Sequence, residues 1–197
     1  SHVLCTYEHQ DILSHNHSHY AGELGLRPPE PIRKNALEAD VVLVVGHRFN
    51  GVPNMAYKFP SSDQTFIHVL PDPNTIGKIF RTDMSVVADS ENFLEQLLNL
   101  KSRNVSVERN EWVALCHQRY LHNDATQPPK NANDGLDFAH LIDALGELAP
   151  DDSVITNDAG NFTSWMHHRF PFRSSMTLIG SEIGAMGMGI PASIAAA

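Results

Sequence analysis

The stretch DVVLVVG at residues 40–46 decides the fold. Its Val and Leu residues follow one another without alternating polar positions, which is typical of a parallel-sheet strand buried on both faces by helices. Two further runs of strand length follow, TFIHVL at residues 65–70 and MSVVA at residues 84–88. Helical patterns separate the runs, and this order predicts a doubly wound α/β unit with a parallel sheet.

The helices around these strands have recognisable starts. Pro31 suits the first turn of a short amphipathic helix that leads into the first strand. Residues 72–74 offer caps for a short helix over Ile76 and Ile79, and Ser90 is the expected cap of the next helix. That helix carries one apolar face, which consists of Phe93, Leu94, Leu97, Leu98 and Leu100.

The rest of the chain predicts a second α/β unit. Residues 1–30 show only weak patterns of regular structure, residues 104–122 predict a partly buried helix, and the polar stretch 123–135 predicts a domain boundary. Beyond it we expect a helix at 136–148, a strand at 154–156, a helix at 162–170, a strand at 176–179 and a glycine-opened helix at 184–197. The predicted divisions are therefore 1–103, a helix and linker at 104–135, and 136–197.

Composition and charge narrow the possible partners. The chain has 14 Lys and Arg against 23 Asp and Glu, and the net charge of -9 disfavours nucleic acid and anionic membrane surfaces. No apolar run approaches the roughly 20 residues that cross a bilayer, and residues 1–20 lack a signal-peptide pattern. We therefore expect a cytoplasmic protein without nucleic-acid or membrane partners. Cys5 and Cys116 lack metal-type or disulfide-type spacing and are expected to be reduced, packed thiols.

Two loops at predicted strand ends could hold a ligand. In a doubly wound sheet, ligands bind beyond the carboxyl ends of the strands. Residues 158–161 combine small residues with a predicted helix start, which suits an anion, and residues 184–189 contain three closely spaced glycines. Glycines in a helix interior cost about 0.8–1 kcal/mol each, so close backbone approach must require them. Tight packing of a helix on a strand would explain the same glycines, and both interpretations remain open on the residues alone.

Longer strings resemble one enzyme family. TNDAGNFTSW at 156–165 and GAMGMGIPASIAA at 184–196 resemble the opening of the diphosphate-binding domain of thiamine-diphosphate-dependent enzymes of the acetolactate synthase type. HYAGELG at 19–25, ADVVLVVG at 39–46 and FIHVLPDP at 66–73 resemble the later part of that family's central domain. The resemblance covers nearly the whole chain in the family's order. It implies the later part of a Rossmann-like central domain followed by the start of a thiamine-diphosphate-binding domain.

The resemblance also implies a set of cofactor contacts. Four residues would line the diphosphate: Ala159, Gly160, Asn161 and Phe162. The carbonyl of Gly184 would accept from the 4'-amino group of thiamine diphosphate, and Ala185 and Met186 would complete that side of the site. The Met186 N–H would serve a pyrimidine nitrogen, while its apolar, adaptable side chain would wedge under the cofactor. Phe162 departs from the polar residue often found there in acetolactate synthases.

The resemblance implies a reaction and names what this chain does not supply. The full-length parent would decarboxylate or ligate 2-oxo acids as a lyase or transferase, in a homodimer or homotetramer. Its Mg²⁺ ligands are expected beyond Ala197, and its activating glutamate in an amino-terminal domain, so none of Glu8, Glu23 or Glu182 takes that role. No catalytic residue and no metal ligand is therefore assigned here. We expect the chain to be an internal piece that is inactive alone.

Three alternative readings involve other residues. His15, His17 and His19 alternate as metal ligands do in an extended segment. Residues 46–51 follow a strand as in a nucleotide-binding module without catalysis, and some relatives bind FAD or an adenosine nucleotide in this domain. Residues 167–169, His-His-Arg, suggest a catalytic cluster, but their helical position favours a solvated or subunit-facing surface.

Overall fold

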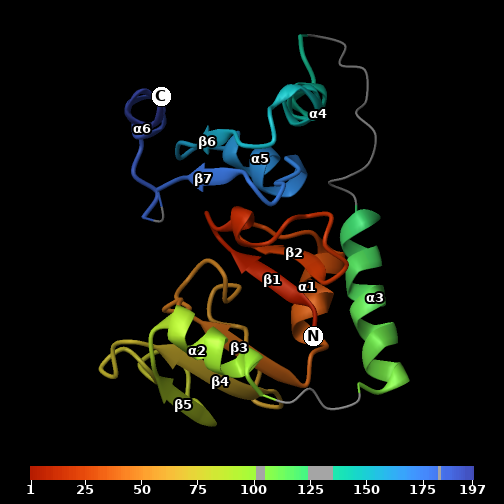
Figure 1. Cartoon of the computed structure of the whole chain (residues 1–197), viewed down its shortest axis with the longest axis vertical. Coiled ribbons are helices and arrows are strands. Elements are labelled where there is room, and N and C mark those ends of the chain that lie inside the picture. Colours follow the sequence, from red (N-terminus) through yellow and green to blue (C-terminus); the bar gives the residue numbers. More distant parts are fainter. Residues whose placement is uncertain (101–104, 124–134, 182) are drawn as a thin grey trace. The chain divides into compact units, whose positions relative to one another are not determined.

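The protein is an α/β chain with parallel sheets, as the sequence predicts (Figure 1). The computed structural model describes residues 1–100, 105–123, 135–181 and 183–197. Contacts divide the chain into two compact units: residues 1–33 with 112–197 form unit 1, and residues 34–111 form unit 2. The predicted connector at 123–135 and Glu182 fall largely or wholly outside the described residues. The predicted divisions at 103 and 135 remain predictions.

Unit 2 is built on a parallel sheet of β3 (Val41–Val45), β4 (Thr65–Leu70) and β5 (Met84–Val87), in that order. Val41 pairs with Thr65, and Ile67 pairs with Met84. All three strands lie where the apolar runs predict them. Parallel pairing brings the carboxyl ends of the strands to one edge of the sheet.

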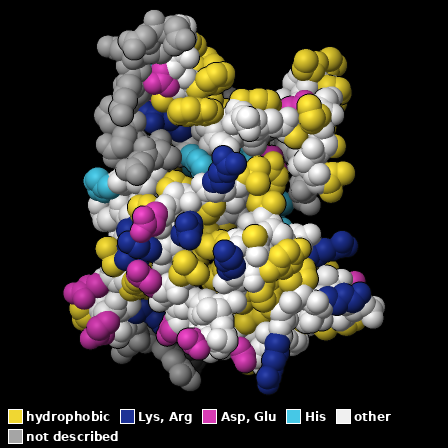
Figure 2. Space-filling view, turned by 180° about the vertical axis from the view of Figure 1, so that it is seen from behind, with side chains coloured by type: hydrophobic (Ala, Val, Ile, Leu, Met, Phe, Trp, Pro, Cys, Tyr) yellow, Lys and Arg dark blue, Asp and Glu magenta, His cyan; other side chains and the backbone are white. Residues whose placement is uncertain are grey.

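One face of this sheet is open to solvent among the described residues of unit 2. Along β3, Val42 and Val44 are 8% exposed, whereas Val41 is 47% and Leu43 is 44% exposed. The prediction that the strand is buried on both faces is therefore wrong. The apolar face of α2 (Ser90–Leu98) is also largely uncovered, because no residue of that helix is buried. Yellow areas of apolar side chains are visible on the face shown in Figure 2.

Two helix starts in unit 2 differ from the predictions. The cap of α2 is Asp89, whose carboxylate accepts from the backbone N–H groups of Glu91 and Asn92, and Ser90 is the first helical residue. Residues 72–80 form turns rather than a helix. Asp72 accepts from the Asn74 N–H and the Thr75 hydroxyl, so its side chain stabilises a turn that does not continue.

The first part of unit 1 is more regular than the sequence predicts. β1 (Val3–Thr6) and β2 (Tyr20–Leu24) pair in parallel, a short 3-10 helix η1 (Gln10–Ile12) follows β1, and every residue of β2 is buried. Helix α1 (Glu30–Leu37) confirms the helix predicted to have Pro31 in its first turn. A Cβ at Gly22 would lie 2.7 Å from Ile32 Cδ1. Helix α1 and strand β2 therefore pack at a distance that only glycine allows. The sequence of β2 shows neither alternating apolar residues nor a long apolar run, so this strand was not predicted.

The second part of unit 1 follows the predicted order closely. It consists of α4 (Phe138–Leu148), β6 (Val154–Thr156), α5 (Thr163–Arg169), β7 (Thr177–Ile179) and α6 (Gly189–Ala196). β6 and β7 are parallel, with Val154 opposite Thr177. The core of this part consists of Ile142, Phe170, Phe172, Met176 and Leu178.

Helix α3 (Val107–Leu121) confirms the helix predicted before the connector. Cys116 on α3 and Cys5 on β1 are buried and form no disulfide, as expected from their spacing. No helix among the described residues is both long and apolar enough to span a membrane.

The last helix starts later than predicted. Residues 184–188 form a loop with a turn at 186–187, and α6 begins at Gly189 rather than Gly184. Gly184 and Gly187 have φ of +70° and +90°, values that a right-handed helix excludes. The glycines therefore serve a loop and not the interior of a helix.

Candidate functional site

Two loops lie at the carboxyl edge of the β6–β7 pair. Residues 157–162, the Asp158 loop, follow β6, and residues 180–188, the glycine loop, follow β7 and lead into α6. The Asn157 N–H donates to the Ile179 carbonyl at 2.9 Å, so the two loops diverge from paired backbone. Parallel strands thus bring both predicted ligand loops to one edge, where α/β proteins bind ligands.

The Asp158 carboxylate joins the two loops. Its Oδ1 accepts from the N–H of Ala159 and of Gly187, both at 2.8 Å, and its Oδ2 accepts from the N–H of Gly189 at 3.1 Å. The amides of Gly189, Gly187 and Ala159 hold the pKa of this carboxyl below its usual range. Sequence reasoning treated the loop as a set of backbone donors and missed Asp158, because an acidic side chain at a strand end gives no distinctive signal.

The glycine loop presents its backbone to open space. A Cβ at Gly184 or Gly187 would meet no atom within 4 Å, and both residues have positive φ. The Ala185 N–H donates to Ser181 Oγ at 2.8 Å, and the Gly184 N–H donates to the Ser181 carbonyl at 2.9 Å. Ala185 and Met186 are exposed, with Met186 at 83%. The loop can therefore accept a ligand close to its main chain, and Met186 is not sealed in the interior.

The Asp158 loop places the other four predicted residues at the same edge. Ala159 is half-buried, whereas Gly160, Asn161 and Phe162 are exposed. A Cβ at Gly160 would lie 2.6 Å from Phe162 Cε1, so the exposed ring lies close against the Gly160 backbone and would have to shift for a larger residue there. Hydrogen bonds from both loops to Asp158 bring this group together with Gly184, Ala185 and Met186. Their predicted contacts with a cofactor remain predictions.

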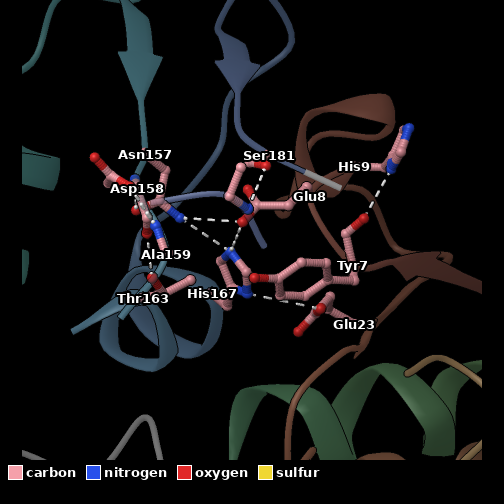
Figure 3. Close-up of polar contacts among 11 residues, drawn as sticks. Tyr7, Glu8, His9, Glu23, Asn157, Asp158, Ala159, Thr163, His167 and Ser181 are labelled. Carbon is pink, nitrogen blue, oxygen red and sulfur yellow. Dashed lines mark hydrogen bonds and ion pairs between the residues drawn. The ribbon is translucent and has the colours of Figure 1, made fainter. Parts of the chain in front are cut away.

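A buried polar cluster lies behind the Asp158 loop. Glu8, Asn157 and His167 point toward one another from three separate segments of unit 1 (Figure 3). Glu8 Oε1 is 3.4 Å from His167 Nε2 and accepts from Asn157 Nδ2 at 3.5 Å. The Asn157 amide nitrogen is also 3.2 Å from His167 Nε2. His167 is only 4% exposed, so the prediction that it lies on a solvated or subunit-facing surface is wrong.

Glu23 is the second acid beside this histidine. Its Oε1 is 3.9 Å from His167 Nδ1, and neither of its carboxylate oxygens has a hydrogen-bond partner among the described residues. Burial, and then the charge of Glu8, raise the pKa of Glu23 well above its usual value. A cavity of about 10 Å³ adjoins Glu23 and Tyr20, which is room for about one water. Burial therefore favours the neutral form of the Glu23 carboxyl.

The histidine tract does not form one face. His15 is 5% exposed, its Nε2 lies 3.1 Å from the Gln10 carbonyl, and its ring stacks on Tyr20 at 4.1 Å. His17 and His19 are exposed and contact each other. Burial lowers the pKa of His15 to about 4, so it is a neutral core residue. Within the part of the chain that the structure describes, no three His, Cys, Asp or Glu residues are arranged to hold a metal ion.

The strand ends of unit 2 offer less to a nucleotide. Gly46 turns the chain after β3 with φ of +76°, as a ligand loop would require. The nearby start of α2 is already bound by the carboxylate of Asp89, however, and Asp72 accepts hydrogen bonds from its own turn. The first amides of α2 are therefore occupied, whereas the backbone at Gly160 and Gly184 in unit 1 is exposed. The loops of unit 1 are therefore the better candidate site.

Comparison with known proteins finds a family model that matches the first part of the chain. Residues 1–97 match the family model described as thiamine pyrophosphate enzyme, central domain; thiamine pyrophosphate is the same compound as thiamine diphosphate. The chain is 28% identical to the acetolactate synthase large subunit of Lactococcus lactis over 197 residues, covering 98% of this chain and 33% of that protein.

Two further relatives agree with this match. The acetolactate synthase isozyme 1 large subunit of Escherichia coli is 29% identical over 187 residues, covering 94% of this chain and 32% of that protein. The putative thiamine pyrophosphate-containing protein YdaP of Bacillus subtilis is 26% identical, covering 98% of this chain and 33% of that protein. The chain thus spans about a third of the length of the curated relatives it matches. The first 97 residues are thus similar to the central domain of thiamine pyrophosphate enzymes, and most of the chain is similar to acetolactate synthase large subunits.

Proposed function

We propose that the chain forms part of a thiamine-diphosphate-dependent enzyme that decarboxylates or ligates 2-oxo acids, as an acetolactate synthase does. The observation that carries this proposal is the convergence of the Asp158 loop and the glycine loop on one strand edge, joined by three backbone amides on one carboxylate. The family match and the similarity to acetolactate synthase large subunits support it.

The residues at this edge fit thiamine diphosphate in their chemistry. On the Asp158 loop, exposed backbone at Gly160 and the Asn161 amide can donate to phosphate oxygens, while Ala159 and Phe162 flank them. Backbone and amide N–H groups of this kind can bind an anion through their dipoles, even where no basic side chain is present. Together the four residues form the proposed diphosphate side of the site.

The glycine loop forms the proposed aminopyrimidine side. Open space at Gly184 leaves room for a ring near its main chain, and the Gly184 carbonyl is the proposed acceptor for the 4'-amino group. Ala185 is small enough to permit that approach. Met186 has an exposed, unbranched side chain that can fill space beneath a bent cofactor and exclude water from it.

When bound, thiamine diphosphate stabilises the negative charge that develops as a 2-oxo acid loses carbon dioxide. The proposed task of this chain is to bind and orient that cofactor. No residue of the chain is proposed as a metal ligand or as the glutamate that activates the cofactor. Magnesium and a homodimeric or homotetrameric assembly are proposed for the complete enzyme on the resemblance alone.

Calorimetric titration tests the proposal. The full natural protein that contains this chain is titrated with thiamine diphosphate in the presence of Mg²⁺, beside Met186→Ala and Asn161→Ala variants. We expect stoichiometric binding by the wild-type protein and weaker binding by both variants, since each loses a proposed contact. Carbon dioxide release from a 2-oxo acid should also fall in Met186→Ala. Unchanged turnover in this variant would count against the assignment of Met186 to the cofactor site. Absence of binding by the wild-type protein would refute the proposed function.

A further inference from the structure

A continuous series of contacts runs from the buried Glu8 to the glycine loop. Glu8 Oε1 accepts from Asn157 Nδ2 at 3.5 Å, and Asn157 Oδ1 accepts from the Asp158 N–H at 3.0 Å. The Asp158 carboxylate then accepts from Gly187 and Gly189. Glu8 and Asn157 lie 149 residues apart in the chain, so the series joins distant segments of unit 1.

The two ends of the Asn157 side chain have different partners. Its nitrogen is a donor and faces an acidic oxygen, while its oxygen is an acceptor and faces a backbone N–H. Rotating the amide by half a turn would place a donor against the Asp158 N–H and an acceptor against the Glu8 carboxylate, so both partners favour the observed orientation. His167 Nε2, at 3.2 Å from the same amide nitrogen, lies beside this contact.

Glu8 also lies against the start of the glycine loop. A Cβ at Gly180 would lie 1.9 Å from Glu8 Oε2, so the carboxylate occupies the space that any larger residue at 180 would need. Glu8 therefore contacts the root of the glycine loop directly and reaches the Asp158 loop through Asn157. The Asp158 carbonyl is held separately, by the Thr163 hydroxyl at 2.6 Å.

These residues are too deeply buried to touch a ligand themselves. Glu8 is 6% exposed, and Asn157 and His167 are each 4% exposed, whereas the glycine loop beyond them is open. We propose that Glu8 and Asn157 are positioning residues, which act through Asp158 to hold the glycine loop in the shape that binds thiamine diphosphate. This inference rests on the proposed function and adds two residues that family resemblance did not assign.

The test compares four variants of the full natural protein: Glu8→Ala, Glu8→Gln, Asn157→Ala and the control Asp152→Ala. Asp152 is an exposed carboxylate two residues before β6, so its removal changes the charge near that strand without touching the series. Hydrogen–deuterium exchange at residues 184–189 is measured without cofactor. Calorimetry then gives the Kd for thiamine diphosphate, and kinetics give KM and kcat.

We expect faster exchange at Gly187 and Gly189 and about tenfold weaker cofactor binding in Glu8→Ala and Asn157→Ala, because each loses a link worth about one hydrogen bond. At saturating cofactor, kcat and the KM for the 2-oxo acid should return to wild-type values. Glu8→Gln keeps an acceptor oxygen for Asn157 and should rescue both exchange and binding, and Asp152→Ala should match the wild type. If Asn157→Ala does not fold, Asn157→Ser replaces it, since a hydroxyl cannot reach both partners.

Two results separate the possible failures. Wild-type exchange and a wild-type Kd in both Glu8→Ala and the Asn157 variant would overturn the positioning role. A wild-type protein that binds no thiamine diphosphate would instead overturn the proposed function, and the exchange rates at Gly187 and Gly189 would still decide whether Glu8 and Asn157 hold the loop.

Discussion

Replacing Gly184 by alanine should weaken cofactor binding by an amount that the backbone conformation sets. Gly184 has φ of +70°, and an added Cβ would meet nothing within 4 Å, so no steric clash contributes in the free protein. The remaining cost is that of an L-residue in the left-handed region, about 1–2 kcal/mol. If the free loop relaxes to avoid this strain, cofactor binding must return residue 184 to the strained conformation. The Kd for thiamine diphosphate should then rise about 5–30-fold.

A second glycine provides a matched control for this variant. Gly77 in unit 2 has φ of +77°, and a Cβ there would also meet nothing within 4 Å. Gly77→Ala therefore introduces the same strain at a position outside the proposed site. Calorimetry of the full natural protein should give a raised Kd for Gly184→Ala and a wild-type Kd for Gly77→Ala. An equal Kd in both variants would refute the reasoning, because strain at 184 would then be unconnected with the ligand.

Three further substitutions test the interior of unit 1. His15 has a pKa of about 4 in the folded protein because it is buried, against an ordinary value of 6.5, so the unfolded chain takes up a proton first as the pH falls. The contribution of His15 to the free energy of unfolding is fully present above about pH 6.5 and declines by about 3 kcal/mol as the pH falls toward 4. His15→Phe should therefore flatten this part of the pH profile, measured by chemical denaturation. Burial and the charge of Glu8 raise the pKa of Glu23, so the folded state favours the protonated carboxyl more than the unfolded chain does. The free energy of unfolding therefore falls as the pH rises above 4.5. Glu23→Gln should therefore raise the melting temperature at pH 8, and this gain should disappear near pH 4.5. A lower melting temperature of Glu23→Gln at pH 8 would contradict the raised pKa of Glu23. Phe172 is 1% exposed, and its ring centroid lies 5.0 Å from that of Phe170. Phe172→Ala should therefore lower the free energy of unfolding, measured by denaturant titration, by about 3–5 kcal/mol. A loss below about 1 kcal/mol would show that this core does not stabilise the unit.

Local patterns predicted most of the elements. β4 and β6 have the predicted bounds, because each is a short apolar run between turn residues. β2 escaped prediction, since its sequence YAGEL includes a glycine and an acid that only tertiary contacts explain. The exposed face of β3 also depends on which helices cover the sheet, and a continuous Val and Leu run cannot report that.

The candidate site was predictable only in part. The rule that ligands bind at the carboxyl ends of parallel strands brought residues 159–162 and 184–186 to one edge. The side chain that connects them, Asp158, lies within a quoted motif, yet its role depends on two amides about thirty residues away. Glu8 and His167 come together across an even longer separation, and no spacing in the sequence encodes their contact.

A structure of the full natural protein with thiamine diphosphate and Mg²⁺ tests the central claim most directly. We predict that the diphosphate lies against residues 159–162, that the aminopyrimidine lies at the Gly184 carbonyl above Met186, and that Asp158 still binds the amides of Gly187 and Gly189. A cofactor bound elsewhere, with the glycine loop packed against protein in its place, would contradict the account.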